Sequence, residues 1–153
     1  MRILFIIMTV FFCFFTSESI KANSESAPYE RNYFSIGYTD INKALQKSEN
    51  NFGRNIALPT QVPPIPFTLI IGRFSDSEGN ENDELEIKFL HEDLSQNHYT
   101  IRSKPIEYGL EIKEEEIDRK TKLEDGNVAV FSNMIIGFDL LVFEKNGYQY
   151  ILS

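Results

Sequence analysis

The histidines are the first residues to consider for chemistry, because imidazole is the side chain that titrates near neutral pH. The sequence has two, His91 and His98. A serine hydrolase would need one of them beside a serine and a carboxylate, and the chain has no Gly-x-Ser-x-Gly motif. His91 precedes Glu92 and Asp93 in a polar stretch that is typical of a solvated loop. We therefore assign no catalytic residue, and a small secreted hydrolase using His91 or His98 is the alternative interpretation.

Two stretches contain residue types that bind metals. His91-Glu92 begins like the zinc motif His-Glu-x-x-His, but the second histidine of that motif is missing. The acidic turn Asp76–Asp83 offers carboxylate and amide oxygens at alternating positions, which are the ligands that calcium prefers. Its glycine, Gly79, is the fourth residue of the turn, whereas an EF-hand loop has glycine at its sixth position. We expect solvated turns, no metal and no cofactor, and calcium binding by the acidic turn stays an open alternative.

The charge balance of the chain restricts its partners. The 153 residues include 15 basic and 23 acidic side chains, for a net charge of −8. Phosphates would repel such a chain, so we exclude nucleic acids and expect a protein, a peptide or a lipid as partner. The one cysteine, Cys13, lies between phenylalanines in an apolar run, a context that disfavours lipid attachment. The rest of the chain has no thiol, which excludes disulfides and thiolate metal sites there.

The N-terminus has the pattern of a signal peptide. Arg2 precedes the apolar run from Ile3 to Thr16, which is shorter than the ~20 residues that span a bilayer. We predict a signal peptide over residues 1–22, with cleavage near Ser19 or Ala22, and secretion or another extracytoplasmic location. An uncleaved membrane anchor is the alternative. Export without disulfides is common in Gram-positive bacteria, which we favour as the source.

Behind a polar, flexible leader (residues 23–36), we predict a single α+β domain over residues 37–153. Thr39-Asp40 offers N-caps for a short helix that ends at Gly53. Prolines between residues 59 and 66 predict an extended lead-in to a strand at Phe67–Phe74. Because the start of that strand (FTLII) is apolar at every position except Thr68, we expect a central strand; the alternative is one wall of an open apolar groove.

The remainder of the chain follows a β pattern. Glu84–Leu90 alternates charged and apolar residues, as a half-exposed antiparallel strand does. Further strands are predicted from Tyr99 and Asn127, and Ile135–Glu144 is a long β run. Asn146-Gly147 predicts a type I′ hairpin that leads into a closing strand. The charged stretch Glu111–Glu124 has neither periodicity, so we predict a loop or an irregular strand. The sum is one helix packed on a curved, mainly antiparallel sheet of about six strands.

Three pieces of this pattern, Ala44–Pro59, Phe67–Leu90 and Gly137–Leu152, resemble a family of exported Gram-positive domains of unknown function. That family is similar in outline to the half-barrel lipoprotein-carrier and sigma-regulator folds. The resemblance implies no catalytic residues. We therefore expect a non-enzymatic binding or sensory module of the cell envelope or medium, which acts through a sheet face or a sheet–helix groove. Four tyrosines could rim such a groove: Tyr99, Tyr108, Tyr148 and Tyr150.

The export hypothesis predicts a defined new N-terminus. When the full sequence is expressed in a Gram-positive host, the protein in the medium or envelope should begin directly after Ser19 or Ala22. Intact-mass and N-terminal peptide mass spectrometry measure this. A product that stays in the cytoplasm with residues 1–22 attached would refute the hypothesis.

Overall fold

The structure, a computed structural model, describes residues 28–76, 83–133 and 139–153. It is an α+β fold with two helices and an antiparallel sheet of seven strands, which confirms the predicted fold class. The helices are α1 (Pro28–Ser35) and α2 (Ile41–Phe52). The strands are β1 (Leu69–Ser75), β2 (Glu84–Leu90), β3 (His98–Pro105), β4 (Arg119–Lys122), β5 (Val128–Ser132), β6 (Leu140–Lys145) and β7 (Tyr148–Leu152).

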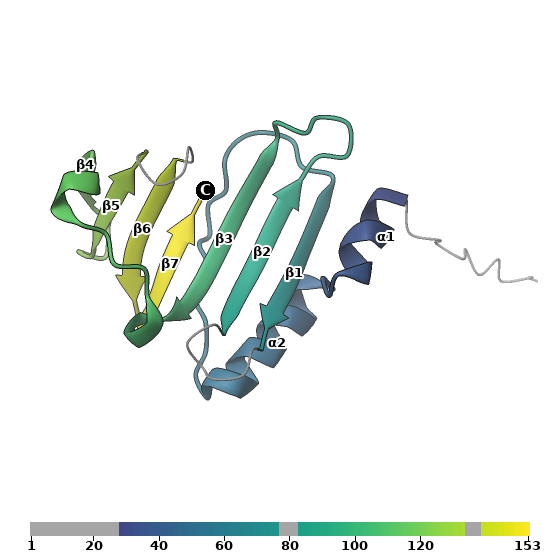
Figure 1. Cartoon of the computed structure of the whole chain (residues 1–153), viewed down its shortest axis with the longest axis horizontal. Coiled ribbons are helices and arrows are strands. Elements are labelled where there is room, and N and C mark those ends of the chain that lie inside the picture. Colours follow the sequence, from purple (N-terminus) through teal and green to yellow (C-terminus); the bar gives the residue numbers. More distant parts are fainter. Residues whose placement is uncertain (1–27, 77–82, 134–138) are drawn as a thin grey trace, which may run out of the picture.

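The strand order in the sheet is β1-β2-β3-β7-β6-β5-β4 (Figure 1). Each half of the sheet is a meander of neighbouring strands, and β7, the latest strand in the sequence, lies between the halves and pairs with β3 and β6. The hairpin between β6 and β7 turns at Asn146 and Gly147, whose φ angles of 53° and 80° suit the predicted type I′ turn. Within the described ranges, neither helix has the length and apolar character needed to cross a membrane.

Helix α2 forms where the sequence predicts it. The Asp40 carboxylate accepts hydrogen bonds from the backbone N–H groups of Asn42 and Lys43, which have no partner inside the helix. Gly53 ends the helix in the left-handed region, with φ of 67°, and its N–H donates to the Glu49 carbonyl. The cap residues therefore set the length of α2, and its apolar face lies on the sheet.

Strand β1 is an edge strand, so the prediction of a central strand at Phe67–Ile71 is wrong. Its apolar character has another cause, because the chain from Tyr38 into α2 wraps around the edge, so that Tyr38 covers one face and α2 covers the other. Tyr38 packs with Ile71 on one face, and Ala44 of α2 lies on the other. Between them, Thr39 and Gly72 exchange two backbone hydrogen bonds of 2.8 and 2.9 Å. A strand can therefore be buried on both faces although it has a neighbouring strand on one side only.

Helix α1 lies inside the range that we predicted as a flexible leader, residues 23–36, of which the structure describes residues 28–36. Its tyrosines join an aromatic row: the rings of Tyr29 and Tyr33 are 5.5 Å apart, and those of Tyr33 and Tyr38 are 5.4 Å apart, both edge to face. These contacts attach α1 to the β1 edge (Figure 1). The sequence does not predict these contacts, because Tyr29 and Tyr33 make them within an otherwise polar stretch without a periodic apolar pattern.

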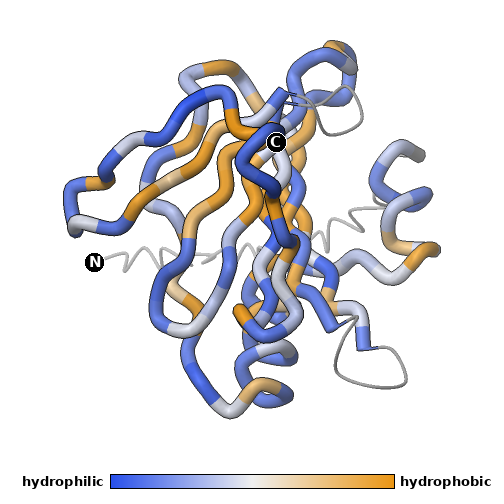
Figure 2. The backbone as a smooth tube through the Cα atoms, turned by 60° about the vertical axis from the view of Figure 1, so that its left-hand side comes forward, coloured by the Kyte–Doolittle hydropathy of each residue, from blue (hydrophilic) through white to orange (hydrophobic). Residues whose placement is uncertain are grey.

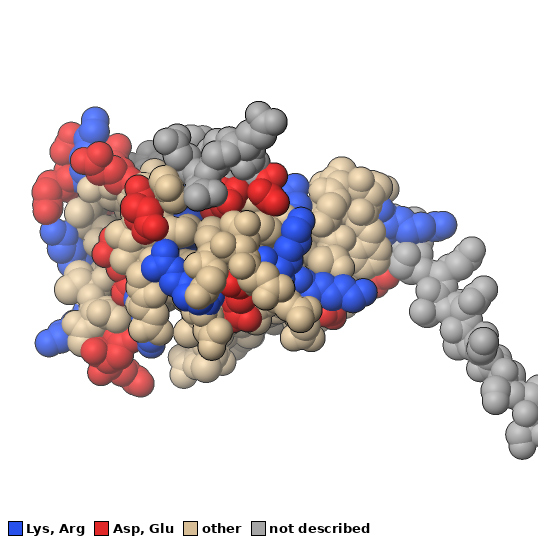
Figure 3. All heavy atoms as spheres, turned by 90° about the horizontal axis from the view of Figure 1, so that it is seen from below, with Lys and Arg blue, Asp and Glu red and all other residues tan. Residues whose placement is uncertain are grey.

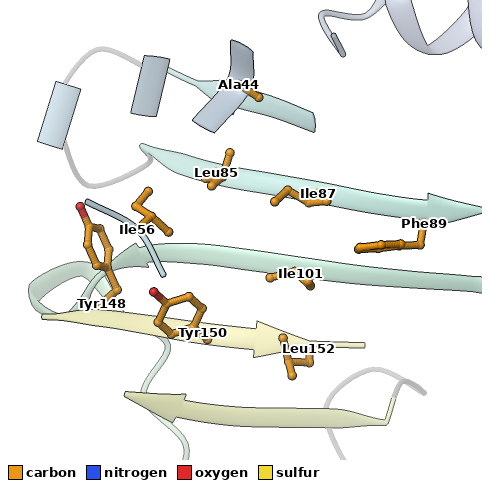
Figure 4. Close-up of a cluster of buried hydrophobic side chains, with 9 residues drawn as sticks. All are labelled: Ala44, Ile56, Leu85, Ile87, Phe89, Ile101, Tyr148, Tyr150 and Leu152. Carbon is orange, nitrogen blue, oxygen red and sulfur yellow. The ribbon is translucent and has the colours of Figure 1, made fainter. Parts of the chain in front are cut away.

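The main core lies between the sheet and the chain segment that contains α2, on the side that we call the helix face. It includes alternate residues of β2, β3 and β7 together with Ala44 and Ile56 (Figure 4). The apolar stretches of the tube run through the strands, and hydrophilic residues lie mostly in the turns (Figure 2). Tyr148 and Tyr150 have no exposed surface. The expectation that they rim an open groove is therefore wrong, because they fill the core.

The opposite side of the sheet is crossed by the segment between β3 and β4, residues 106–118, which we call the strap. The buried Gln149 side chain accepts a 2.6 Å hydrogen bond from the Leu110 N–H and donates a 2.9 Å bond to the Leu110 carbonyl. Ile112 of the strap packs on Leu140 and Val142. The charged stretch predicted as a loop or irregular strand thus contains a crossing and β4, which accounts for the seventh strand.

The close approach of α2 at Gly72 yields a stability prediction. A Cβ atom at this position would lie 2.8 Å from the Ala44 Cβ and 3.3 Å from the Ile41 Cα, so Gly72→Ala should lower the free energy of unfolding by about 1–3 kcal/mol. Urea denaturation measures this. In the double variant with Ala44→Gly, the loss should be smaller than the sum of the two single losses; simple additivity would contradict the proposed clash.

Candidate functional site

The two histidines both lie at the β2–β3 turn and serve the local backbone. The His91 Nδ1 atom accepts hydrogen bonds from the N–H groups of Asp93 and Leu94, at 3.1 and 3.2 Å. The His98 Nδ1 atom lies 3.1 Å from the Ser95 carbonyl oxygen. In the described parts of the chain, neither ring is hydrogen-bonded to a serine hydroxyl or a carboxylate, the arrangement that nucleophilic catalysis needs.

Most of the predicted acidic turn, residues 77–82, lies outside the described residues, so its calcium-binding alternative stays a prediction. Its last residue, Asp83, is buried, and its carboxylate accepts a 2.9 Å hydrogen bond from the Asn51 side chain of α2. That carboxylate therefore joins the turn to the helix. Across the three described ranges, no three His, Cys, Asp or Glu side chains are grouped so that they could hold a metal ion.

A buried carboxylate with several cations lies on the face opposite the core. Glu86 of β2 is 4% exposed, although the alternation of Glu84–Leu90 predicts a solvated charge. It accepts a hydrogen bond from the Tyr38 hydroxyl, and cations of β2 itself and of its neighbours β1 and β3 surround it. The nitrogen-to-oxygen distances are 3.0 Å for Arg73, 3.0 Å for Lys88 and 3.5 Å for Arg102. We call these five residues the Glu86 cluster.

The Glu86 cluster sets opposite pKa directions for two carboxylates on the same strand face. Burial alone would raise the pKa of Glu86, but hydrogen bonds from Tyr38 and Lys88 and the positive charges of Lys88 and Arg102 outweigh it and lower the pKa. Burial raises the pKa of Glu84, where Arg102 compensates only in part. Glu86 is thus a structural anion. A carboxylate with a lowered pKa is a poor proton acceptor, so the cluster does not have the properties of a general base.

The helix face offers a different kind of site. Its cover ends at the extended segment 57–61, and beyond it lies a hollow of about 480 Å³, which we call the β6 hollow. Leu141 and Phe143 of β6 form its floor together with Leu152 of β7, and the turn after β4 forms the far wall. At the rim, the Lys145 ammonium lies 2.7 Å from the Asp125 carboxylate. The hollow has an apolar floor and a charged rim, which are typical features of a binding surface.

The β6 hollow replaces the predicted sheet–helix groove. Between α2 and the sheet there is contact, because Ala44 approaches Gly72 and Phe52 packs edge to face on Phe74 and Tyr148, at 5.5 and 5.6 Å. The residue pattern does not reveal the hollow, since Leu141 and Phe143 belong to a continuous apolar run, residues 140–143, as a buried strand does. The hollow depends instead on how far the covering segment reaches. Helix α2 and the segment after it extend over β1, β2, β3 and β7, and not over β6.

Comparison with known proteins identifies no relatives: no family model, no curated protein and no solved structure matches the chain. The resemblance to exported Gram-positive domains stays a prediction.

The Glu86 cluster generates a stability prediction with a defined pH dependence. Glu86→Gln removes the charge that holds Arg73, Lys88 and Arg102, and should lower the free energy of unfolding by about 3 kcal/mol at pH 7. Because folding lowers the pKa of Glu86, the difference is complete above its ordinary pKa of 4.5. It should shrink as the pH falls from there through the lower folded-state pKa.

Urea denaturation between pH 3 and pH 7 measures this difference, and Glu84→Gln is the matched control on the same strand face. Folding raises the pKa of Glu84, so the stability of the Glu84→Gln variant relative to the native chain should increase as the pH rises. Equal pH profiles for the two variants would show that the cluster does not distinguish the two carboxylates.

Proposed function

We propose that this chain is an exported, non-enzymatic binding module of the cell envelope or medium, which holds an extended segment of a partner protein or peptide in the β6 hollow. The observation that carries the proposal is that the cover of the helix face ends at residues 57–61 while the apolar floor continues over Leu141 and Phe143. Both side chains are partly exposed, and Phe143 stacks on Tyr150 with ring centroids 5.0 Å apart. The floor is thus apolar, accessible and held in place by the core.

An extended polypeptide fits this site best. The chain's own segment 57–61 already crosses the helix face without regular secondary structure and forms one wall of the hollow. A partner segment beside it would bury its apolar side chains on Leu141 and Phe143, and its polar groups would reach the Lys145–Asp125 pair at the rim. The competing function is a hydrolase using His91 or His98. The positions of these residues do not favour it, because backbone groups of their own turn occupy both Nδ1 atoms.

Site-specific photocrosslinking tests the proposed function. A benzophenone amino acid at Leu141 should capture a polypeptide when the protein is produced in its own cells, whereas the same amino acid at Ile70 should not. Ile70 is a suitable control because it is an apolar residue on the helix face too and is 48% exposed, but it lies on the edge strand β1 in the other half of the sheet. The crosslink should disappear when Phe143→Asp places a charge in the floor.

Two results would reject the proposal: equal crosslinking at the two positions, or capture of lipid alone at Leu141. A separate measurement addresses the hydrolase alternative. The double variant His91→Ala/His98→Ala should rescue a deletion strain as well as the native chain does. Failure of the well-folded double variant, with the crosslink at Leu141 retained, would favour the enzyme.

A further inference from the structure

A second hollow lies on the other face of the same strands, between the strap and β4, β5 and β6. It has a volume of about 400 Å³, which is in the range of small-molecule sites, and we call it the strap pocket. Since successive residues of a strand point to opposite faces, Val142 faces this pocket while its neighbour Leu141 faces the β6 hollow. The two sites therefore lie on opposite faces of the same strands, and Phe143 lines both of them.

The strap pocket is held open by polar contacts at both ends of the strap. At one end, the Gln149 side chain makes its two hydrogen bonds to Leu110, and a Cβ atom on Gly109 would lie 2.9 Å from the Gln149 Nε2 atom. At the other end, the Lys120 ammonium contacts both carboxylate oxygens of Glu114, at 2.9 and 3.0 Å. Strap and sheet are thus fixed relative to each other, so a ligand would not have to order them.

The lining of the pocket is mostly aliphatic. Ile112 and Ile117 come from the strap, and three valines come from β5 and β6. One of these, Val128, is the first residue of β5 and is 55% exposed. The aliphatic residues that line the pocket are Leu110, Ile112, Ile117, Val128, Val130 and Val142. Such walls favour the apolar part of a ligand.

The charges at the rim determine the sign of the ligand. Lys120 is neutralised by Glu114, whereas Glu144 is exposed and forms no ion pair with any residue that the structure describes. Basic and acidic side chains lie together at the end of the molecule where β4 lies (Figure 3). The whole chain carries a net charge of −8, which attracts cations and repels anions. The one unpaired charge that lines the pocket is therefore negative.

We propose that the strap pocket binds a small organic cation with an apolar body, an alkyl- or arylammonium ion. Its apolar part lies on Val130, Val142 and Ile112, and its ammonium group pairs with the Glu144 carboxylate. This proposal goes beyond the function proposed above, because it concerns the opposite sheet face and a small molecule. It does not depend on polypeptide binding in the β6 hollow.

Titration of the purified, isotope-labelled protein with phenethylammonium, monitored by NMR, tests the proposal. Chemical-shift changes should concentrate on the strap and on β5 and β6, and 2-phenylethanol and 3-phenylpropionate should bind about tenfold more weakly or not at all. Glu144→Gln should weaken phenethylammonium binding about tenfold and leave the binding of 2-phenylethanol unchanged. Glu92→Gln, which removes an exposed carboxylate at the distant β2–β3 turn, should change neither.

Three results would overturn the proposal: no shifts at the strap pocket, equal affinity for the cation and the neutral alcohol, or full affinity in Glu144→Gln. The spectrum of each variant shows whether it is folded. If Glu144→Gln were unfolded, Glu144→Asp would provide the test, because it keeps the charge and should keep most of the preference for the cation. Loss of that preference in a folded Glu144→Asp variant would also count against the proposal.

Discussion

The arrangement of this fold depends on one close contact at the edge of its sheet. Gly72 has no side chain, so α2 can lie on β1 with Ala44 in direct contact with the strand. The same residue exchanges both backbone hydrogen bonds with Thr39. The short segment before α2 therefore reaches the edge strand, forms hydrogen bonds with the backbone groups of Gly72 and continues into the helix. Tyr38 immediately precedes Thr39 and lies on the sheet face opposite α2, where its hydroxyl contacts Glu86.

Local signals account for the part of the fold that the sequence predicts well. Asp40 and Gly53 define α2, and Asn146-Gly147 defines the last hairpin, because each acts through hydrogen bonds or φ angles of its own neighbourhood. The position of a strand in the sheet is a long-range property. Burial on two faces makes a strand apolar at successive positions, whether the strand is central or at the edge of the sheet. The apolar sequence of β1 therefore did not indicate its place in the strand order.

The same distinction applies to the candidate sites. Alternation places Glu86 on the outer face of β2, but it does not reveal that Tyr38, Arg73 and Arg102 will meet there, since these come from three other elements. Nor does the alternation of residues reveal which strands α2 and the segment after it leave uncovered. The hollows exist because α2 and the segment after it do not extend over β6, and because the strap contacts the other face only in places and leaves a space over β4, β5 and β6. Both are consequences of connection lengths, which residue patterns do not encode.

The two halves of the sheet differ in how far other segments cover them. Around β1, β2 and β3, helices and aromatic rings cover the strands, and the buried ion pairs fix their arrangement. Around β5 and β6, two apolar surfaces stay accessible on opposite sides. Strand β7 joins the halves, and the order of the strands has a consequence for synthesis. Because β3 and β6 are joined only through β7, the last strand of the sheet in the sequence, the two meanders stay separate in the nascent chain until β7 has been synthesised.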